Sequence, residues 1–147
     1  MTDVERRQGK RATFEMLQAP WSRRTVVVVE PYASGRETIC ACIVELGHGV
    51  IGAGSLEHAA RLVADGSDER VDLLVVAHDM PWIDGWGFLA HLHSRPYVPA
   101  IVVCDDTDDR PIRRTLAIRP CFSLRRTFSL AELETTIGVV TRSRRPP

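Results

Sequence analysis

The sequence predicts an α/β fold: a doubly wound, three-layer sandwich in which five parallel strands lie between helices. Two observations predict it. Short runs of β-branched residues alternate along the chain with longer stretches of helical periodicity. The first run, TVVVVE at residues 25–30, is apolar without alternation, as in strands that are buried on both faces. The length of 147 residues suits one such domain with a sizeable core.

Five short runs of apolar and small residues predict the strands, at residues 25–30, 50–53, 73–77, 100–104 and 121–124. A helix is expected after each strand, because apolar residues then recur every three or four positions. The expected N-caps of these helices are Ser34, Ser55, Asp84, Asp108 or Asp109, and Ser129. Glu37 and Glu132 follow the first and the last of these caps at the spacing of a capping box.

The domain is expected to span residues 24–141, between a flexible basic extension at 1–23 and a basic tail at 142–147. A short docking helix at residues 14–21 is the alternative for part of the extension. Hydrophobic residues make up 44% of the chain and charged residues 26%, as is typical of a soluble globular protein. The net charge is zero, no apolar run has the length of a bilayer span, and no secretory signal opens the chain. We therefore expect a cytoplasmic protein without membrane contact.

The cysteines are expected to be free thiols that pack as small apolar side chains: Cys40, Cys42, Cys104 and Cys121. Cys40 and Cys42 lie two positions apart in an expected helix, so their side chains do not face one another. A redox or metal role for this pair is the less favoured alternative, since disulfides are rare in cytosolic proteins.

Ligands of an open α/β sheet bind beyond the carboxyl ends of its strands. The residues that end the expected strands are Glu30–Pro31, Ala77–His78–Asp79, Cys104–Asp105–Asp106 and Arg125–Arg126. A turn with the sequence MPWIDG, residues 80–85, follows the third strand. A functional site is therefore expected at this edge of the sheet.

From residue 25 to about residue 140 the chain resembles the receiver domain of two-component response regulators. The resemblance is carried by the MPWIDG turn, by the proline that opens PAIVVC at 99–104, and by RTF at 126–128, where the family usually has Lys-Pro-Phe. The spacings between these landmarks also fit the family. The resemblance implies a flavodoxin-like topology and a role in bacterial signal transduction.

The resemblance also implies which positions would carry phosphoryl transfer. In the family an aspartate that ends the third strand attacks the phosphoryl group, and it holds Mg²⁺ together with two acids that end the first strand. A hydroxyl residue that ends the fourth strand and a lysine that ends the fifth contact the phosphoryl oxygens. The matching positions here are Ala77, Glu30 with Pro31, Cys104 and Arg126.

These residues predict a degenerate receiver, or pseudo-receiver, in which the phosphoryl chemistry is lost. Ala77 has no heteroatom with which to attack, and Pro31 removes a direct metal ligand. We therefore expect no enzyme activity, no cofactor and no bound metal. The aromatic residue usual on the family's fifth strand is also displaced, because Ser123 stands at its position and Phe122 points to the other face.

Two alternatives concern the acids at the same edge. Asp79 could be a relocated acceptor, which would make the protein a phosphoryl-accepting response regulator with shifted acidic residues. Glu30, Asp79 and Asp106 could also bind a divalent cation weakly, since hard cations take several oxygen ligands. The interpretation we favour is that these loop acids are solvated and stabilise the N-termini of adjacent helices.

A protein partner is expected to contact basic and aromatic surface residues: Arg110, Arg113, Arg114, Arg119, Arg125, Trp82 and Trp86. The resemblance implies that the fourth helix, the fifth strand and the fifth helix form the surface for partners and for a homodimer. The alternative is a nucleic-acid-binding regulator that uses the arginine-rich surface. Because charges of both signs lie there, we favour a phosphorylation-independent protein-protein interaction module.

Overall fold

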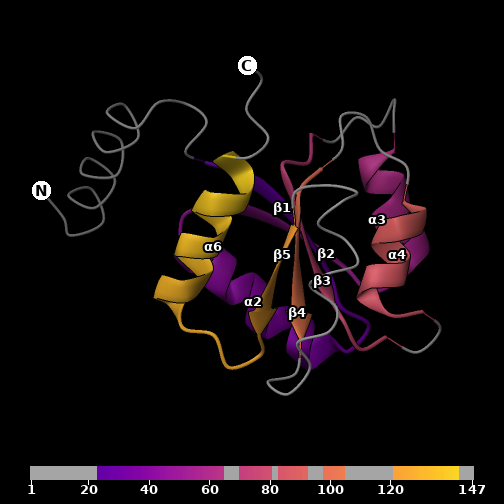
Figure 1. Ribbon diagram of the computed structural model, residues 1–147, viewed down its shortest axis with the longest axis horizontal. Coiled ribbons are helices and arrows are strands. Elements are labelled where there is room, and N and C mark those ends of the chain that lie inside the picture. The colour runs from indigo at the N-terminus through magenta and orange to yellow at the C-terminus, as the bar shows by residue number, and fades with distance from the viewer. Residues whose placement is uncertain (1–22, 65–69, 81–82, 93–97, 105–120, 143–147) are drawn as a thin grey trace, which may run out of the picture.

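The computed structural model describes residues 23–64, 70–80, 83–92, 98–104 and 121–142 (Figure 1). Its strands are β1 (Thr25–Val29), β2 (Gly49–Ala53), β3 (Leu73–Ala77), β4 (Ala100–Cys104) and β5 (Cys121–Arg125). Its helices are α2 (Ala33–Glu45), α3 (Leu56–Val63), α4 (Gly85–His91) and α6 (Leu130–Arg142). Each strand lies within one residue of its predicted bounds. The expected fourth helix, residues 1–22 and residues 143–147 lie outside the described residues.

The sheet is parallel throughout, with the strand order β2-β1-β3-β4-β5. Helices α2 and α6 cover one face of the sheet and helices α3 and α4 cover the other, which gives three layers (Figure 1). The predicted doubly wound α/β sandwich is therefore confirmed. In the part of the chain that the structure describes, no helix is long and apolar enough to cross a membrane.

The valine run of β1 is explained by its place between two cores. Val26 and Val28 pack with residues of α2 and α6, whereas Val27 and Val29 pack with residues of α3 and α4. All four valines are buried. A strand with two covered faces needs an apolar side chain at every position, which is why the run shows no polar alternation.

The predicted N-caps of α3, α4 and α6 are confirmed. Ser55 Oγ and Asp84 Oδ1 each accept a hydrogen bond from the backbone N–H three residues later, at 3.2 and 2.6 Å. Ser129 and Glu132 form the two reciprocal bonds of a capping box, at 3.1 and 3.3 Å. Each cap satisfies backbone donors that have no partner inside the helix.

The prediction that Ser34 caps the first helix is wrong. Helix α2 begins at Ala33, and its N-cap Tyr32 makes no side-chain cap bond. The Arg36 N–H donates to the Tyr32 carbonyl at 2.9 Å, so Ser34 lies inside the first turn. The Tyr32 N–H donates to Glu30 Oε1 at 3.2 Å. The carboxyl group that follows β1 therefore helps to fix where the helix starts.

The cysteines are free thiols, as expected. Cys104 and Cys121 are buried in the core that α3 and α4 cover, and Cys40 and Cys42 are half-buried against the other core. Burial raises the pKa of the Cys40 thiol, which favours the uncharged form that packs in an apolar core.

The glycine of the MPWIDG turn is required by a close approach between α4 and the sheet. The Gly85 N–H donates to the His78 carbonyl at 2.9 Å. A Cβ on Gly85 would lie 2.5 Å from the carbonyl oxygen of Ala77 and 3.1 Å from His78 Cα. Both are backbone atoms, which cannot rotate away as a side chain can. The first turn of α4 therefore lies directly against the end of β3.

Replacing Gly85 by alanine is expected to lower the free energy of unfolding by about 3 kcal/mol, because the added methyl group overlaps a fixed carbonyl. Gly49→Ala is the matched control, since its Cβ would lie 3.8 Å from the nearest atom, an ordinary contact, and we expect little change. Urea unfolding followed by circular dichroism measures both variants. Equal stabilities would contradict this explanation of the turn.

Candidate functional site

The parallel register brings the carboxyl ends of four strands to one edge of the sheet. Glu30, the residue after β1, continues the β1–β3 register beside Ala77. Cys104 at the end of β4 pairs with Arg125 at the end of β5. Adjacent strands are about 4.8 Å apart. The structure therefore places the predicted pocket residues, including Arg126, along a single edge.

The position that the resemblance assigns to the phosphoryl acceptor is a buried methyl group. Ala77 is the last residue of β3, and 1% of it is exposed. The backbone beyond it is also fixed, since the His78 N–H donates to the Val103 carbonyl at 2.9 Å. An alanine side chain has no lone pair, so it can neither attack a phosphorus atom nor bind a metal.

Glu30 is the acid that remains at the end of β1, and 1% of it is exposed. Its Oε1 accepts the hydrogen bond from the Tyr32 N–H, whereas Oε2 has no partner among the described residues. Burial raises the pKa of Glu30 above its usual value. The Tyr32 N–H and the charges of Arg126 and Arg36 lower this pKa, and Asp79 raises it. Glu30 is therefore within electrostatic reach of two arginines.

The described residues of this edge do not fit Mg²⁺. Pro31 has no side-chain oxygen, and its carbonyl accepts a hydrogen bond from Arg36 Nη1 at 3.4 Å. Among residues that the structure describes, no group of three or more His, Cys, Asp or Glu side chains could hold a metal ion. The guanidinium groups of Arg36 and Arg126 would also repel a cation beside Glu30. Asp106, a weak metal candidate from the sequence, lies outside the described residues.

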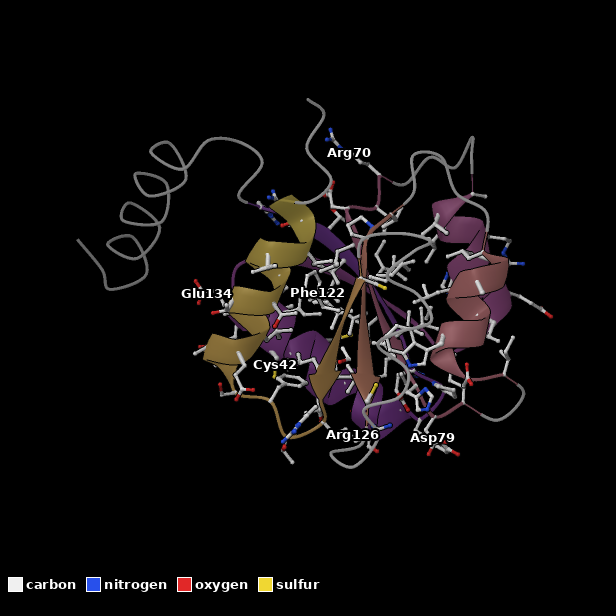
Figure 2. The ribbon with its side chains drawn as sticks, viewed as in Figure 1. Cys42, Arg70, Asp79, Phe122, Arg126 and Glu134 are labelled. Carbon is white, nitrogen blue, oxygen red and sulfur yellow. The ribbon has the colours of Figure 1, made fainter. Side chains whose placement is uncertain are left out.

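Cys104 and Arg126 stand where the resemblance places a hydroxyl residue and a lysine. The Cys104 side chain is buried, and its Sγ donates to the Val102 carbonyl at 3.7 Å. The Arg126 N–H donates to the Cys104 carbonyl at 2.9 Å, which holds the residue after β5 at the end of β4. Arg125 and Arg126 are both exposed. Figure 2 shows Arg126 and Asp79 at the same edge, with Asp79 on the side of α4.

The prediction that Trp86 is an exposed partner contact is wrong. Its side chain is 3% exposed and packs in the core between α4 and the sheet. Because Gly85 allows the first turn of α4 to approach β3 closely, the next residue turns toward the sheet. The indole ring therefore fills core volume. Its Nε1 has no hydrogen-bond partner in the described part of the chain.

Most of the other predicted partner contacts lie outside the described residues: Trp82, Arg110, Arg113, Arg114 and Arg119. Arg125 is described, and it is exposed at the end of β5. Of the predicted surface, the structure therefore describes β5 and α6.

Sequence reasoning missed Arg36. Its Nη1 donates to the Glu30 carbonyl at 2.8 Å, and its side chain lies over Gly52 and Gly54. A signal was present in the sequence: an arginine in the first turn of the helix after β1, together with a Gly-x-Gly pattern where the next strand ends. Neither the arginine nor the glycine pattern predicts that the two are in contact unless the fold is known.

The raised pKa of Glu30 predicts part of the pH dependence of stability. The raised pKa means that the folded state binds the proton of the Glu30 carboxyl group more tightly than the unfolded state does. Protonated Glu30 therefore stabilises the fold fully at pH values below its pKa in the unfolded chain, near 4.5. That contribution is lost as the pH rises from there through the folded pKa. Glu30→Gln removes the titration, so the stability of the variant relative to wild type is expected to increase from acidic to neutral pH. Urea unfolding at a series of pH values measures this difference, and a pH-independent difference would show that Glu30 titrates normally.

No protein-family model and no curated protein sequence matches this chain. Solved structures do match it. A response regulator receiver domain from Clostridium thermocellum superposes with a TM-score of 0.71 over 82% of this chain and 96% of that chain, at 16% sequence identity. The chemotaxis protein CheY4 of Vibrio cholerae superposes with a TM-score of 0.68 over 80% and 98% of the two chains, at 18% identity. FixJ-N superposes with a TM-score of 0.66 over 81% and 94%, at 19% identity. The chain therefore has the receiver fold, with its flavodoxin-like topology.

Proposed function

We propose that this domain is a receiver-fold module of bacterial signal transduction that binds a protein partner and does not depend on phosphorylation. The observation that carries the proposal is the buried methyl group of Ala77 at the end of β3. The resemblance places the phosphoryl acceptor there, and alanine has no atom that can form a bond to phosphorus. Because the fold is retained, the surfaces of the domain remain suited to binding.

The neighbouring positions support the proposal independently of Ala77. Pro31 supplies no side-chain ligand, and burial of Glu30 disfavours the carboxylate form that a metal would need. Cys104 offers a thiol, which is a weaker hydrogen-bond donor than a hydroxyl group. Restoring the acceptor alone would therefore leave the metal that assists phosphoryl transfer poorly held.

The described part of the proposed partner surface combines the edge strand β5 with α6. The exposed Arg125 ends β5, and three apolar side chains are exposed on the two elements: Phe122, Leu130 and Val139. Glu134 is also exposed, and Figure 2 shows it on the outer side of α6. Apolar area with charged residues around it is typical of protein interfaces. We propose the same surface for a homodimer.

Phosphoryl acceptance at Asp79 is the second candidate function, and one observation favours it. Asp79 follows Ala77 by two residues, is exposed, and lies close enough to Glu30 to raise the pKa of that carboxyl group. Its carboxylate is therefore accessible to a small phosphodonor. The metal site that would assist the transfer is as incomplete for Asp79 as for position 77.

Intact-mass measurement after incubation with Mg²⁺ and acetyl phosphate tests the proposal. The wild type is expected to gain no phosphoryl group. Ala77→Asp alone is expected to be modified slowly, because Pro31 still leaves the metal one ligand short. Ala77→Asp combined with Pro31→Asp is expected to react faster, by a factor on the order of ten or more, because the second acid returns. Circular dichroism verifies that each variant is folded.

Asp79→Asn distinguishes the two candidate functions. A phosphoryl adduct on the wild type that disappears in Asp79→Asn would establish the second candidate and refute the first. If Ala77→Asp alone reacts as fast as the double variant, the interpretation of Pro31 is wrong.

A further inference from the structure

Arg36 links the loop between β1 and α2 to the helix that follows it. The residue lies in the first turn of α2 and is half-buried. Its Nη1 donates to the carbonyl oxygens of Glu30 at 2.8 Å and of Pro31 at 3.4 Å. Charged donors form stronger hydrogen bonds than neutral ones. One guanidinium group therefore restrains two successive carbonyls at the point where the chain leaves the sheet.

Two glycines make room for this guanidinium group. A Cβ on Gly54 would lie 2.8 Å from Arg36 Nη1, and a Cβ on Gly52 would lie 3.3 Å from Arg36 Cδ. Neither glycine has the positive φ that by itself favours glycine, whereas Gly47 has a φ of 90°. The space beside both glycines is therefore occupied by Arg36, so a side chain at either position would have to share it.

Other hydrogen bonds also hold the β1–α2 loop between Glu30 and Arg36. The Glu30 N–H donates to the Ala53 carbonyl at 3.2 Å, and the Arg36 N–H donates to the Tyr32 carbonyl at 2.9 Å. The Glu30 carboxyl group also packs against Gly35, where a Cβ would lie 3.5 Å from Glu30 Cδ. Groups of α2 and β2 thus hold the loop in place.

We infer that Arg36 is a positioning residue that holds the β1–α2 loop in one conformation, with its fixed positive charge, rather than a metal ion, ordering the chain at the end of β1. The inference rests on the proposed function, because a domain without phosphoryl chemistry has no need of an exchangeable metal there. The order of the loop is then independent of Mg²⁺. The loop therefore presents the same surface whether or not Mg²⁺ is present.

Hydrogen exchange at the amides of Tyr32 and Arg36 in the full-length chain tests the inference. Both amides are expected to exchange about tenfold faster in Arg36→Gln, which loses a charge-assisted hydrogen bond. Arg36→Lys keeps the charge and is expected to retain part of the protection. Arg61→Gln, on the exposed side of α3, is the matched control and is expected to leave both amides unchanged. Addition of Mg²⁺ is expected to leave the wild type unchanged.

Gly54→Ala displaces the guanidinium group without removing it. The methyl group would lie 2.8 Å from Arg36 Nη1, and because the end of an arginine side chain can move, the variant is expected to fold. It should show the same faster exchange as Arg36→Gln. The double variant is expected to exchange no faster than Arg36→Gln, since both changes remove one interaction. Gly49→Ala, at the start of β2 and away from Arg36, is the control.

The pKa of Glu30, followed by NMR of its carboxyl carbon, separates the effect of charge from a loss of packing. Arg36 lowers this pKa in the wild type, so Arg36→Gln is expected to raise it and Arg36→Lys to leave it nearly unchanged. Unchanged protection at Tyr32 in Arg36→Gln, or wild-type protection that increases with Mg²⁺, would overturn the inference. A phosphoryl adduct found by mass would instead refute the proposed function, since the exchange measurement contains no phosphodonor.

Discussion

The parallel register of the central sheet is the constraint on which the rest of this structure depends. Because β1, β3, β4 and β5 run in the same direction, the residues that end them meet at one edge. Apolar strands buried on both faces produce this arrangement whatever side chains stand at the edge. In this chain those side chains are a methyl group, a buried acid, a thiol and a guanidinium group: Ala77, Glu30, Cys104 and Arg126. The fold therefore sets where these side chains meet, and the sequence sets which groups they carry.

The MPWIDG turn illustrates how a fold signature can be independent of the side chain that ends the adjoining strand. Gly85 is needed because its Cβ would overlap the carbonyl of Ala77, and that carbonyl is present whatever residue stands at position 77. Asp84 caps α4, and Trp86 fills the core beneath it. These interactions stabilise the fold and take no part in phosphoryl transfer. The resemblance carried by the turn therefore predicts fold more directly than function.

The elements that could be predicted from sequence are those whose signal is local. Uninterrupted apolar runs located the strands, and side chains that bond to a nearby backbone N–H located most helix starts. The prediction for Trp86 failed because the close approach of Gly85 to β3 is a contact across the fold, which no local pattern contains. The prediction for Ser34 failed because α2 begins one residue earlier, at Ala33, where the Tyr32 N–H bonds to the Glu30 carboxyl group. The role of Arg36 depends on glycines at and beyond the end of β2, so no local pattern contains it.

Phosphorus-31 NMR of the wild-type protein with Mg²⁺ and phosphoramidate is the most direct measurement of whether this receiver fold acts without phosphorylation. With a buried methyl group at position 77, the spectrum should contain the donor and its hydrolysis products but no protein-bound acyl phosphate. A protein-bound acyl-phosphate resonance that is lost on removal of Mg²⁺ would contradict the account, because it would require both a nucleophilic carboxylate and a working metal site.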